Sequence, residues 1–257
     1  MSDPRIDLSI EGHVARITLR RPEKLNAIDE DMIDALLKAC RTIERSDARV
    51  AIVAGEGGKS FCAGGDIEAW GNLDAETFSR RWLRDGHGAF DALARLTVPL
   101  IAVLNGHALG GGLELAACAD LRIAEEHVKI GQPEPGLGII PGWSGTQRAS
   151  RRFGTQLVRR MALFGEIYNA QEALAAGLVD KVVATGEGAA AAEAAAGRVL
   201  KRSPRATELT KMLINAAEGE ENERVVEALA GAVAAASDDL TEGLTAYRQK
   251  RPTRFGK

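Results

Sequence analysis

The sequence predicts an α/β protein with much parallel strand pairing, followed by a helical C-terminal region. Through the first two-thirds of the chain, short apolar strands alternate with helical segments, an order typical of a parallel sheet covered by helices. From Gly145 onward helices dominate, interrupted by the strand LVDKVV. The alanine-rich stretch GAAAAEAAAGRVL favours a helix over disorder. A chain of 257 residues accommodates one large domain, or one domain with a small appendage.

The N-terminal segment predicts a hairpin and then a helix. IDLSI is followed by VARITL, in which Ala15, Ile17 and Leu19 alternate with polar residues, the period of a half-buried strand. Asp29 stands where it can cap the next helix, whose apolar stripe includes Met32. RVAIVAG then reads as a short buried strand.

The middle of the chain alternates glycine-rich turns with buried strands. EGGKSFCAGGD predicts a loop, and a helix is expected from roughly residue 75 to residue 96. The strand PLIAVLNG, the stretch GHALGGGLELAACADL and the strands DLRIA and VKIGQPE follow. Ser203 and Pro204 have the order that begins a helix. We expect a boundary between residues 197 and 203, which separates a core of residues 1–197 from a helical region of residues 198–257.

Composition excludes several classes of function. The net charge of −3, without a basic block, argues against nucleic-acid binding. No apolar run approaches 18 residues, so no membrane span is predicted. MSDPRIDLSI lacks the features of a signal peptide. Cys40, Cys62 and Cys118 are odd in number and widely spaced, which favours reduced thiols and a cytoplasmic location.

Several apparent motifs fail on spacing. GEGGKS lacks the first glycine of a phosphate-binding loop, and GHALGGG lacks the third glycine of a dinucleotide fingerprint. GWSGT is not a nucleophile elbow, because Thr146 replaces the second glycine. The four histidines show no metal-ligand spacing, so no metal site is predicted.

Two glycine-rich turns, FCAGGD and LGGGLE, each follow a buried strand and each end in an acid. Glycine lets a backbone approach a ligand closely and leaves N–H groups free to point at it. Two such groups form an oxyanion hole, and a helix that starts at the second turn would add its dipole. Each turn alone is as well explained by packing, but the two together favour a site.

Two carboxylates accompany these turns. Glu114 lies near the start of the glycine-led helix, where the N–H ends favour a carboxylate. Glu134 lies between Pro133 and Pro135, which predicts a rigid, extended backbone. Two carboxyl groups in one cleft raise each other's pKa and can divide acid and base roles. Opposite a polarised carbonyl, they could move protons at the adjacent carbons.

Over nearly its whole length the chain resembles the enoyl-CoA hydratase/isomerase (crotonase) family. The matching stretches, in order, are RRPEKLNAI, SFCAGGDI, PLIAVLNGHALGGGLELAACADLRIA, IGQPEPGLGIIPG, GTQR, AQEALAAGLVDKVV and EGLTAYRQKRP. The resemblance implies a crotonase (ClpP/crotonase-like) spiral of β-β-α turns with a helical C-terminal trimerisation region. It also implies an assembly of trimers that commonly pair into hexamers. The apolar stripe that includes Val225, Val226, Leu229 and Val233 is consistent with helix–helix burial.

The resemblance also implies the roles of individual residues. The N–H groups of Gly65 and Gly111 would form the oxyanion hole for the thioester carbonyl. Glu114 would activate the water that adds to C3, and Glu134 would protonate C2. The residues expected along the coenzyme A path are Lys24, Leu25, Ala63, Gly65, Asp66, Ile67, Gly111 and Trp143.

The implied activity is that of an enoyl-CoA hydratase, a lyase of fatty acid and lipid metabolism (β-oxidation) that converts a trans-2-enoyl-CoA into a 3-hydroxyacyl-CoA. No cofactor is implied, because coenzyme A belongs to the substrate.

Two residues depart from the usual pattern of the family. Trp143 follows IPG where a small residue is common, which could narrow the acyl pocket or reshape the loop that supports Glu134. Gly65 stands where many members carry alanine or a larger residue, which predicts a slightly looser oxyanion hole.

Other readings remain open within and outside this fold. A Δ3-Δ2-enoyl-CoA isomerase typically depends on a single acid, so the presence of both Glu114 and Glu134 favours a hydratase. Acyl-CoA hydrolases, decarboxylases and dehalogenases of the family usually alter one of the two positions. A non-catalytic or nucleic-acid-binding relative should carry a basic patch, which the acidic balance argues against. A serine peptidase on a related spiral would need a serine after the required turn, and none follows it.

Overall fold

The computed structural model describes residues 3–255, except for the side chains of residues 223 and 224. Its internal contacts divide the chain into two units, Met1–Lys211 and Met212–Lys257. This division comes later than the boundary suggested by the sequence. Helix α9 (Gly188–Val199) belongs to the first unit, because it packs against that unit's main sheet.

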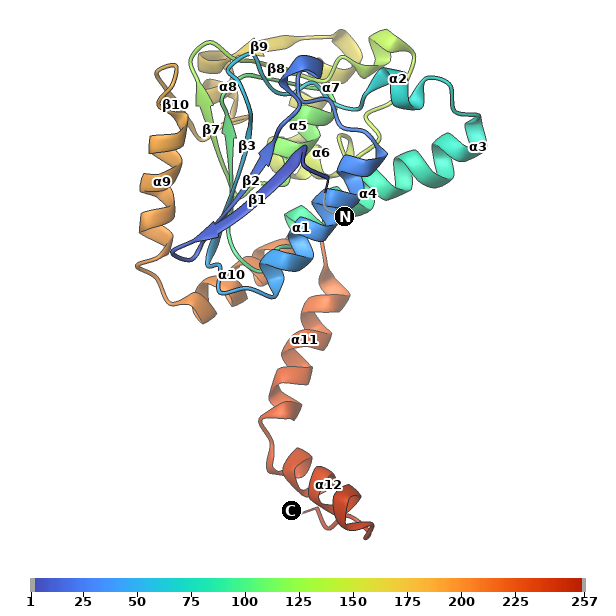
Figure 1. Ribbon diagram of the computed structural model, residues 1–257, viewed down its shortest axis with the longest axis vertical. Coiled ribbons are helices and arrows are strands. Elements are labelled where there is room, and N and C mark those ends of the chain that lie inside the picture. The colour runs from blue at the N-terminus through green and yellow to red at the C-terminus, as the bar shows by residue number, and fades with distance from the viewer. Residues whose placement is uncertain (1–2, 256–257) are drawn as a thin grey trace. The chain divides into compact units, whose positions relative to one another are not determined.

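The main sheet of the first unit has six strands and is largely parallel (Figure 1). In spatial order they are β1 (Ile6–Glu11), β2 (Val14–Leu19), β3 (Val50–Gly55), β5 (Leu100–Leu104), β7 (Leu121–Glu125) and β10 (Lys181–Val183). The β1–β2 pair is antiparallel, and β2, β3, β5, β7 and β10 pair in parallel. The predicted hairpin and the predicted parallel pairing are therefore confirmed.

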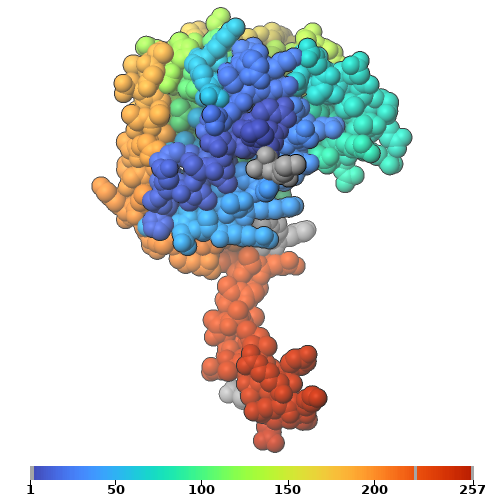
Figure 2. All heavy atoms as spheres, in the orientation of Figure 1, coloured from blue at the N-terminus to red at the C-terminus, as the bar shows by residue number. Residues whose placement is uncertain are grey.

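The two faces of this sheet bury different residues because side chains alternate along each strand. Val53 and its neighbours on one face join a large core with α1 (Glu30–Glu44) and α4 (Arg84–Ala94). Ile52 and its neighbours on the other face pack against small residues of α9. Asp29 caps α1 by accepting the N–H of Met32 at 3.1 Å, as expected. In the view of Figure 2, β1, β2 and α1 (blue) form much of the visible surface of this unit.

A second, smaller sheet was not foreseen from the sequence. Its strands, in spatial order, are β4 (Ser60–Cys62), β6 (His107–Leu109), β8 (Lys129–Gly131) and β9 (Ile167–Asn169). Strands β4, β6 and β8 pair in parallel, and β9 runs antiparallel to β8. Each strand has only three residues, too few to show a period of two in the sequence.

Short helices and turns connect these strands in the first unit. They are the 3-10 turn η1 (Pro22–Lys24), α2 (Ile67–Trp70), α3 (Ala75–Thr77), the π-helical turn η2 (Phe78–Leu83), α5 (Gly111–Ala116), the 3-10 turn η3 (Glu134–Leu137), α6 (Gln147–Phe153), α7 (Thr155–Phe164) and α8 (Ala170–Ala176). The helix expected over residues 75–96 is present as α3, η2 and α4 in succession. The π-helical turn η2 contributes three residues to the lining of a pocket, Phe78, Trp82 and Leu83.

The C-terminal part of the chain is helical, as predicted. Helix α10 (Pro204–Ala217) begins as expected, with the N–H of Ala206 donating to the Ser203 hydroxyl at 3.3 Å. Helices α11 (Asn222–Ala235) and α12 (Asp238–Gln249) follow. On α11, Val226 is 66% exposed and Val233 is 74% exposed. Within the described residues, none of the helices has the length and apolar character needed to cross a membrane.

Candidate active site

Three neighbouring parallel strands bring distant turns together at one edge of the small sheet. Cys62 of β4 lies opposite Ala108 of β6, and Leu109 of β6 lies opposite Gly131 of β8. The turns that follow these strands therefore emerge on the same side, where α/β folds commonly bind ligands. A Cβ added at Gly111 would lie only 3.0 Å from the Cα of Gly64. The two glycine-rich turns are in direct contact, as the sequence suggested.

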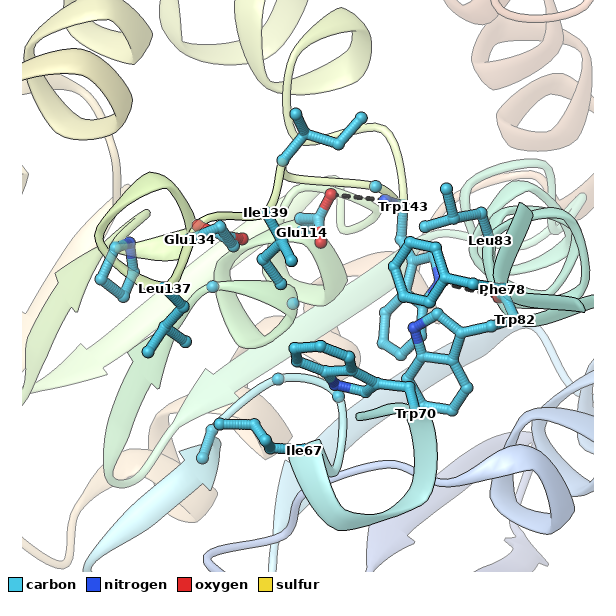
Figure 3. A pocket seen from close by; sticks show the side chains of 18 residues that line it. Ile67, Trp70, Phe78, Trp82, Leu83, Glu114, Glu134, Leu137, Ile139 and Trp143 are labelled. Carbon is cyan, nitrogen blue, oxygen red and sulfur yellow. Dashed lines mark hydrogen bonds between the residues drawn. The ribbon is translucent and has the colours of Figure 1, made fainter. Parts of the chain in front are cut away.

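A pocket of about 90 Å³ opens at this edge (Figure 3). Seven of the residues singled out from the sequence line it: Ala63, Gly65, Ile67, Gly111, Glu114, Glu134 and Trp143. The rest of the lining consists of Gly64, Trp70, Phe78, Trp82, Leu83, Gly110, Pro133, Leu137, Ile139, Ile140 and Gly142. The pocket is thus mostly apolar, with two carboxyl groups and two glycine turns as its polar elements, an arrangement typical of small-molecule sites.

Two backbone amides in this pocket are available to a ligand. Gly111 is the first residue of α5, a position whose N–H has no acceptor within the helix. The turn that carries Gly65 is held by its neighbours, because Ile28 donates to the carbonyl of Gly64 and Asp66 donates to the carbonyl of Ile28, each at 2.8 Å. Within residues 3–255, neither Gly65 nor Gly111 uses its own N–H in a hydrogen bond.

Glu114 is the more tightly held of the two acids. Its side chain is 3% exposed, and its Oε1 accepts the N–H groups of Trp143 at 2.7 Å and Gly145 at 2.6 Å. Burial, and next the nearby carboxyl of Glu134, raise the pKa of Glu114 to about 8. The backbone bonds oppose this rise. Two N–H donors therefore stabilise a charge on Glu114 inside the apolar run, whereas burial and Glu134 favour its protonated form.

Glu134 is 7% exposed, but its surroundings differ from those of Glu114. Neither of its carboxyl oxygens has a hydrogen-bond partner among the described residues. Burial raises the pKa of Glu134 to about 7. The predicted extended backbone is wrong: Glu134 is the first residue of the 3-10 turn η3, with Pro135 second. Proline fits the first turn of a helix because its missing N–H would have no acceptor there.

The raised pKa of Glu114 predicts how stability depends on pH. An acid whose pKa is higher in the folded protein stabilises the fold below its unfolded pKa of 4.5, and that stability is lost as the pH rises toward about 8. Glutamine at position 114 does not ionise. The melting temperature of Glu114→Gln should therefore rise relative to wild type between about pH 5 and about pH 9. Thermal melts at both pH values check this, and a constant difference would contradict it.

An aromatic wall forms one side of the pocket. Figure 3 shows Trp70, Phe78, Trp82 and Trp143 gathered opposite Glu134, with Glu114 between. These include all three tryptophans of the chain. The sequence drew attention to Trp143 but missed the other three rings. The only available signal was that Trp70 and Trp82 both follow the first glycine-rich turn closely in sequence.

The backbone of Trp143 contacts an acid that the sequence did not connect with it. A narrower acyl pocket or a reshaped loop around Glu134 was expected; in addition the N–H of Trp143 bonds to Glu114, and its indole Nε1 donates to the carbonyl of Trp82 at 3.2 Å. The expected loosening at Gly65 is also absent. A Cβ added at Gly65 would lie 2.6 Å from Cζ2 of Trp82, so the indole already fills the space of a larger side chain.

Three of the residues expected along the coenzyme A path, Lys24, Leu25 and Asp66, lie next to the pocket lining in sequence and contacts. The carbonyl of Leu25 accepts the N–H of Ala63 at 3.1 Å, which fixes the segment carrying Lys24 beside the first glycine turn. Lys24 forms an ion pair with Glu68 at 2.6 Å. Asp66 pairs with Arg21 at 2.8 Å. Lys24, Leu25 and Asp66 thus border the pocket without being part of its lining.

Residues 3–255 contain no cluster of three or more histidine, cysteine, aspartate or glutamate side chains that could hold a metal ion. Cys40, Cys62 and Cys118 are buried, and none of them forms a disulfide with another described residue. Burial raises the pKa of Cys62 to about 12, and its sulfur accepts the N–H of Gly64 at 3.4 Å. Cys62 therefore packs beneath the first glycine turn as a neutral thiol.

Comparison with known proteins places the chain among acyl-CoA enzymes. Residues 9–257 match the family model described as enoyl-CoA hydratase/isomerase. A crotonyl-CoA hydratase of Syntrophomonas wolfei is 37% identical over 99% of both chains. Among solved structures, DspI of Pseudomonas aeruginosa is 33% identical with a TM-score of 0.82, over 100% of this chain and 98% of that one. An enoyl-CoA hydratase of Bacillus anthracis is 30% identical with a TM-score of 0.80, over 98% of both chains.

Proposed function

Because the chain belongs to the enoyl-CoA hydratase/isomerase (crotonase) family, we propose that it is an enoyl-CoA hydratase. It adds water across the double bond of a trans-2-enoyl-CoA and gives a 3-hydroxyacyl-CoA. One observation carries the proposal: two buried carboxyl groups with raised pKa values share an apolar pocket with two free backbone amides. The amides suit a carbonyl that becomes an enolate, and the acids suit proton transfer at the neighbouring carbons.

The amides of Gly65 and Gly111 bind the thioester oxygen. Both donate to it, and these bonds strengthen as negative charge develops during the addition. Removal of one such donor typically costs about 3–4 kcal/mol of transition-state stabilisation. The polarised carbonyl draws electrons from the conjugated double bond and makes C3 electrophilic.

The two acids then supply the elements of water. The carboxylate of Glu114 accepts a proton from a water molecule, whose oxygen forms the new bond to C3. The electrons of the C2–C3 double bond move toward the thioester and give an enolate. The carboxyl of Glu134 donates its proton to C2, and the carbonyl is restored. Proton exchange with solvent returns both acids to their starting states. No group beyond the substrate, water and these residues enters the reaction.

The catalytic cycle starts with one proton shared between Glu114 and Glu134. The raised pKa values of both groups favour a single shared proton near neutral pH. The pKa values place it on Glu114 even with its two backbone bonds counted. The two values lie close together, so both arrangements of the single proton are populated near neutral pH. The proposed cycle uses the arrangement in which Glu134 carries the proton and the N–H groups of Trp143 and Gly145 stabilise the carboxylate of Glu114.

The family's isomerases are the second candidate, since a proton shuttle by Glu134 alone would move a double bond. The placement of Glu114 favours hydration instead. Its two backbone bonds fix a second carboxylate in the same pocket, and an isomerase has no use for it. The hydrolase, decarboxylase and dehalogenase activities of the family are disfavoured for the same reason.

The test is hydration of crotonyl-CoA, followed as the loss of ultraviolet absorbance of the conjugated double bond. We expect turnover without any added metal or cofactor, and 3-hydroxybutyryl-CoA as the product. Incubation with a 3-enoyl-CoA in the same assay separates the two candidates, because an isomerase would raise the absorbance. Failure to hydrate any trans-2-enoyl-CoA would overturn the proposal.

Coenzyme A binding and assembly belong to the same proposal. Lys24, Leu25, Asp66 and Ile67 border the nucleotide and pantetheine path; this is supported by Ile67 in the pocket lining and by the other three beside it. Residues 198–257 mediate assembly into a homotrimer or a dimer of trimers and help to close the site. The exposed Val226 and Val233 of α11 support this, since an apolar stripe on a helix suits burial against another helix. The enzyme acts in the cytoplasm. A monomeric mass by light scattering would contradict the assembly.

A further inference from the structure

The indole of Trp143 is fixed more firmly than a lining residue needs to be. It is 3% exposed and lies between two other rings. The ring centroid of Trp82 is 5.0 Å away and that of Phe90 is 5.1 Å away, both in tilted or edge-on arrangements that aromatic pairs prefer. Its Nε1 bonds to the carbonyl of Trp82, and its backbone N–H bonds to Glu114. The indole therefore has one orientation and is tied to the acid beside C3.

Three glycines leave room for this pair of indoles. A Cβ at Gly86 would collide with the pyrrole edge of Trp143, and one at Gly111 would lie 3.1 Å from its benzene edge. A Cβ at Gly65 would lie 2.6 Å from Trp82. Gly86 lies inside α4, where glycine lowers helix stability by about 1 kcal/mol relative to alanine. Glycine lowers helix stability at the position where the indole of Trp143 needs space. Gly65, Gly86 and Gly111 are therefore complementary in shape to the indoles of Trp82 and Trp143.

The position of Trp82 depends on the π-helical turn η2 (Phe78–Leu83). Such turns are rare and occur frequently at functional sites, because they shift the side chains on a helix face. This one lies between α3 and α4 and presents Phe78, Trp82 and Leu83 to the same pocket. Both indoles of the wall thus depend on local features that regular helices would not provide.

The wall stands where an acyl chain would continue. In the proposed reaction the thioester oxygen would bind at Gly65 and Gly111, next to the rings of Trp82 and Trp143. Carbon C3 would lie beside Glu114, whose Oε1 is bound to the backbone of Trp143. Carbons beyond C4 would then have to pass the fixed indole. A cavity of about 150 Å³ admits benzene, and this pocket offers about 90 Å³.

We propose that Trp143 and Trp82 form a rigid wall that restricts this site to short, unbranched enoyl groups of about four carbons. The inference rests on the proposed hydratase function and names the substrate class of that site. Gly65, Gly86 and Gly111 act by admitting the indoles. The tryptophans set specificity and take no part in proton transfer.

The experiment measures kcat/KM for straight-chain trans-2-enoyl-CoA substrates with four, six, eight and ten carbons, and for trans-cinnamoyl-CoA. In a hydrophobic pocket one methylene changes specificity by about 10- to 200-fold. The wild-type enzyme should therefore prefer the four-carbon substrate over the eight-carbon one by at least about 100-fold, and should hydrate cinnamoyl-CoA poorly. Among the straight-chain substrates, chain length is the only variable, because coenzyme A is common to all.

Trp143→Leu and Trp82→Leu are the variants that remove the wall. Any residue except proline at position 143 keeps the N–H that binds Glu114, so the acid stays in place. Each variant should raise kcat/KM for the eight-carbon substrate relative to crotonyl-CoA by at least about tenfold. Phe153→Leu is the matched control, since Phe153 is a buried aromatic of α6 outside the pocket lining. The control should leave the ratio unchanged.

The outcomes test separately the proposed hydratase function and the role of Trp143 and Trp82 in specificity. No hydration of any chain length overturns the proposed function itself. Hydration of four to ten carbons at similar rates by the wild-type enzyme, or a preference for cinnamoyl-CoA, overturns the wall alone. A short-chain preference that stays the same in Trp143→Leu and in Trp82→Leu also overturns the wall, provided that circular dichroism shows both variants to be folded. A preference that relaxes in both variants and not in Phe153→Leu supports it.

Discussion

Replacing Glu114 by glutamine is expected to lower kcat for crotonyl-CoA hydration by about 10²- to 10⁴-fold, the contribution usual for a general acid or base. An amide cannot take the proton from the attacking water. The fold should survive, because the Oε1 of glutamine can still accept the N–H groups of Trp143 and Gly145. Steady-state kinetics and a thermal melt of the same sample measure the two effects separately.

Glu125→Gln provides the matched control for Glu114→Gln. Glu125 is also a buried carboxyl, but it lies at the end of β7 and accepts the N–H of Gly188 at 3.1 Å, outside the pocket. This variant should hydrate crotonyl-CoA at close to the wild-type rate. Activity of Glu114→Gln within threefold of wild type, or a similar loss in both variants, would refute the role of Glu114 as the base.

The sequence located the site because its key residues carry local signals. FCAGGD and LGGGLE each place a glycine turn directly after a buried strand, and the structure joins the two turns through the β4–β6 pair. Glu114 was conspicuous because a charge within an apolar run needs a partner. The hairpin, the cap at Asp29 and the start of α10 were predictable for similar reasons: each depends on residues close in sequence.

Features that depend on tertiary contacts were missed. The small sheet consists of three-residue strands that are stable only beside one another. The direction of Trp82 depends on the π-helical turn, which no residue pattern marks. Gly65 looked like a loss of packing until the indole that fills its space was located. The prolines around Glu134 did not fix its conformation from sequence, because the same two residues are compatible with an extended segment and with a 3-10 turn.

Glu134→Gln is expected to lower hydration by a similar factor of about 10²–10⁴, with a distinct signature. Its carboxyl oxygens have no partner among the described residues, so the substitution removes no hydrogen bond of the folded protein in that part of the chain. Thermal stability should not fall. The loss arises because an amide cannot deliver a proton to C2 of the enolate.

The two acid variants should differ in hydrogen exchange at C2. Butyryl-CoA has no double bond to hydrate, but its C2 proton becomes acidic when Gly65 and Gly111 bind the thioester oxygen. Wild type and Glu114→Gln should both exchange this proton in D₂O, because Glu134 alone removes and returns it. Glu134→Gln should not. Mass spectrometry of the recovered thioester measures the exchange, and loss in Glu114→Gln with retention in Glu134→Gln would reverse the assignment. Because the polarising amides are unchanged in both variants, the comparison isolates which carboxyl faces C2.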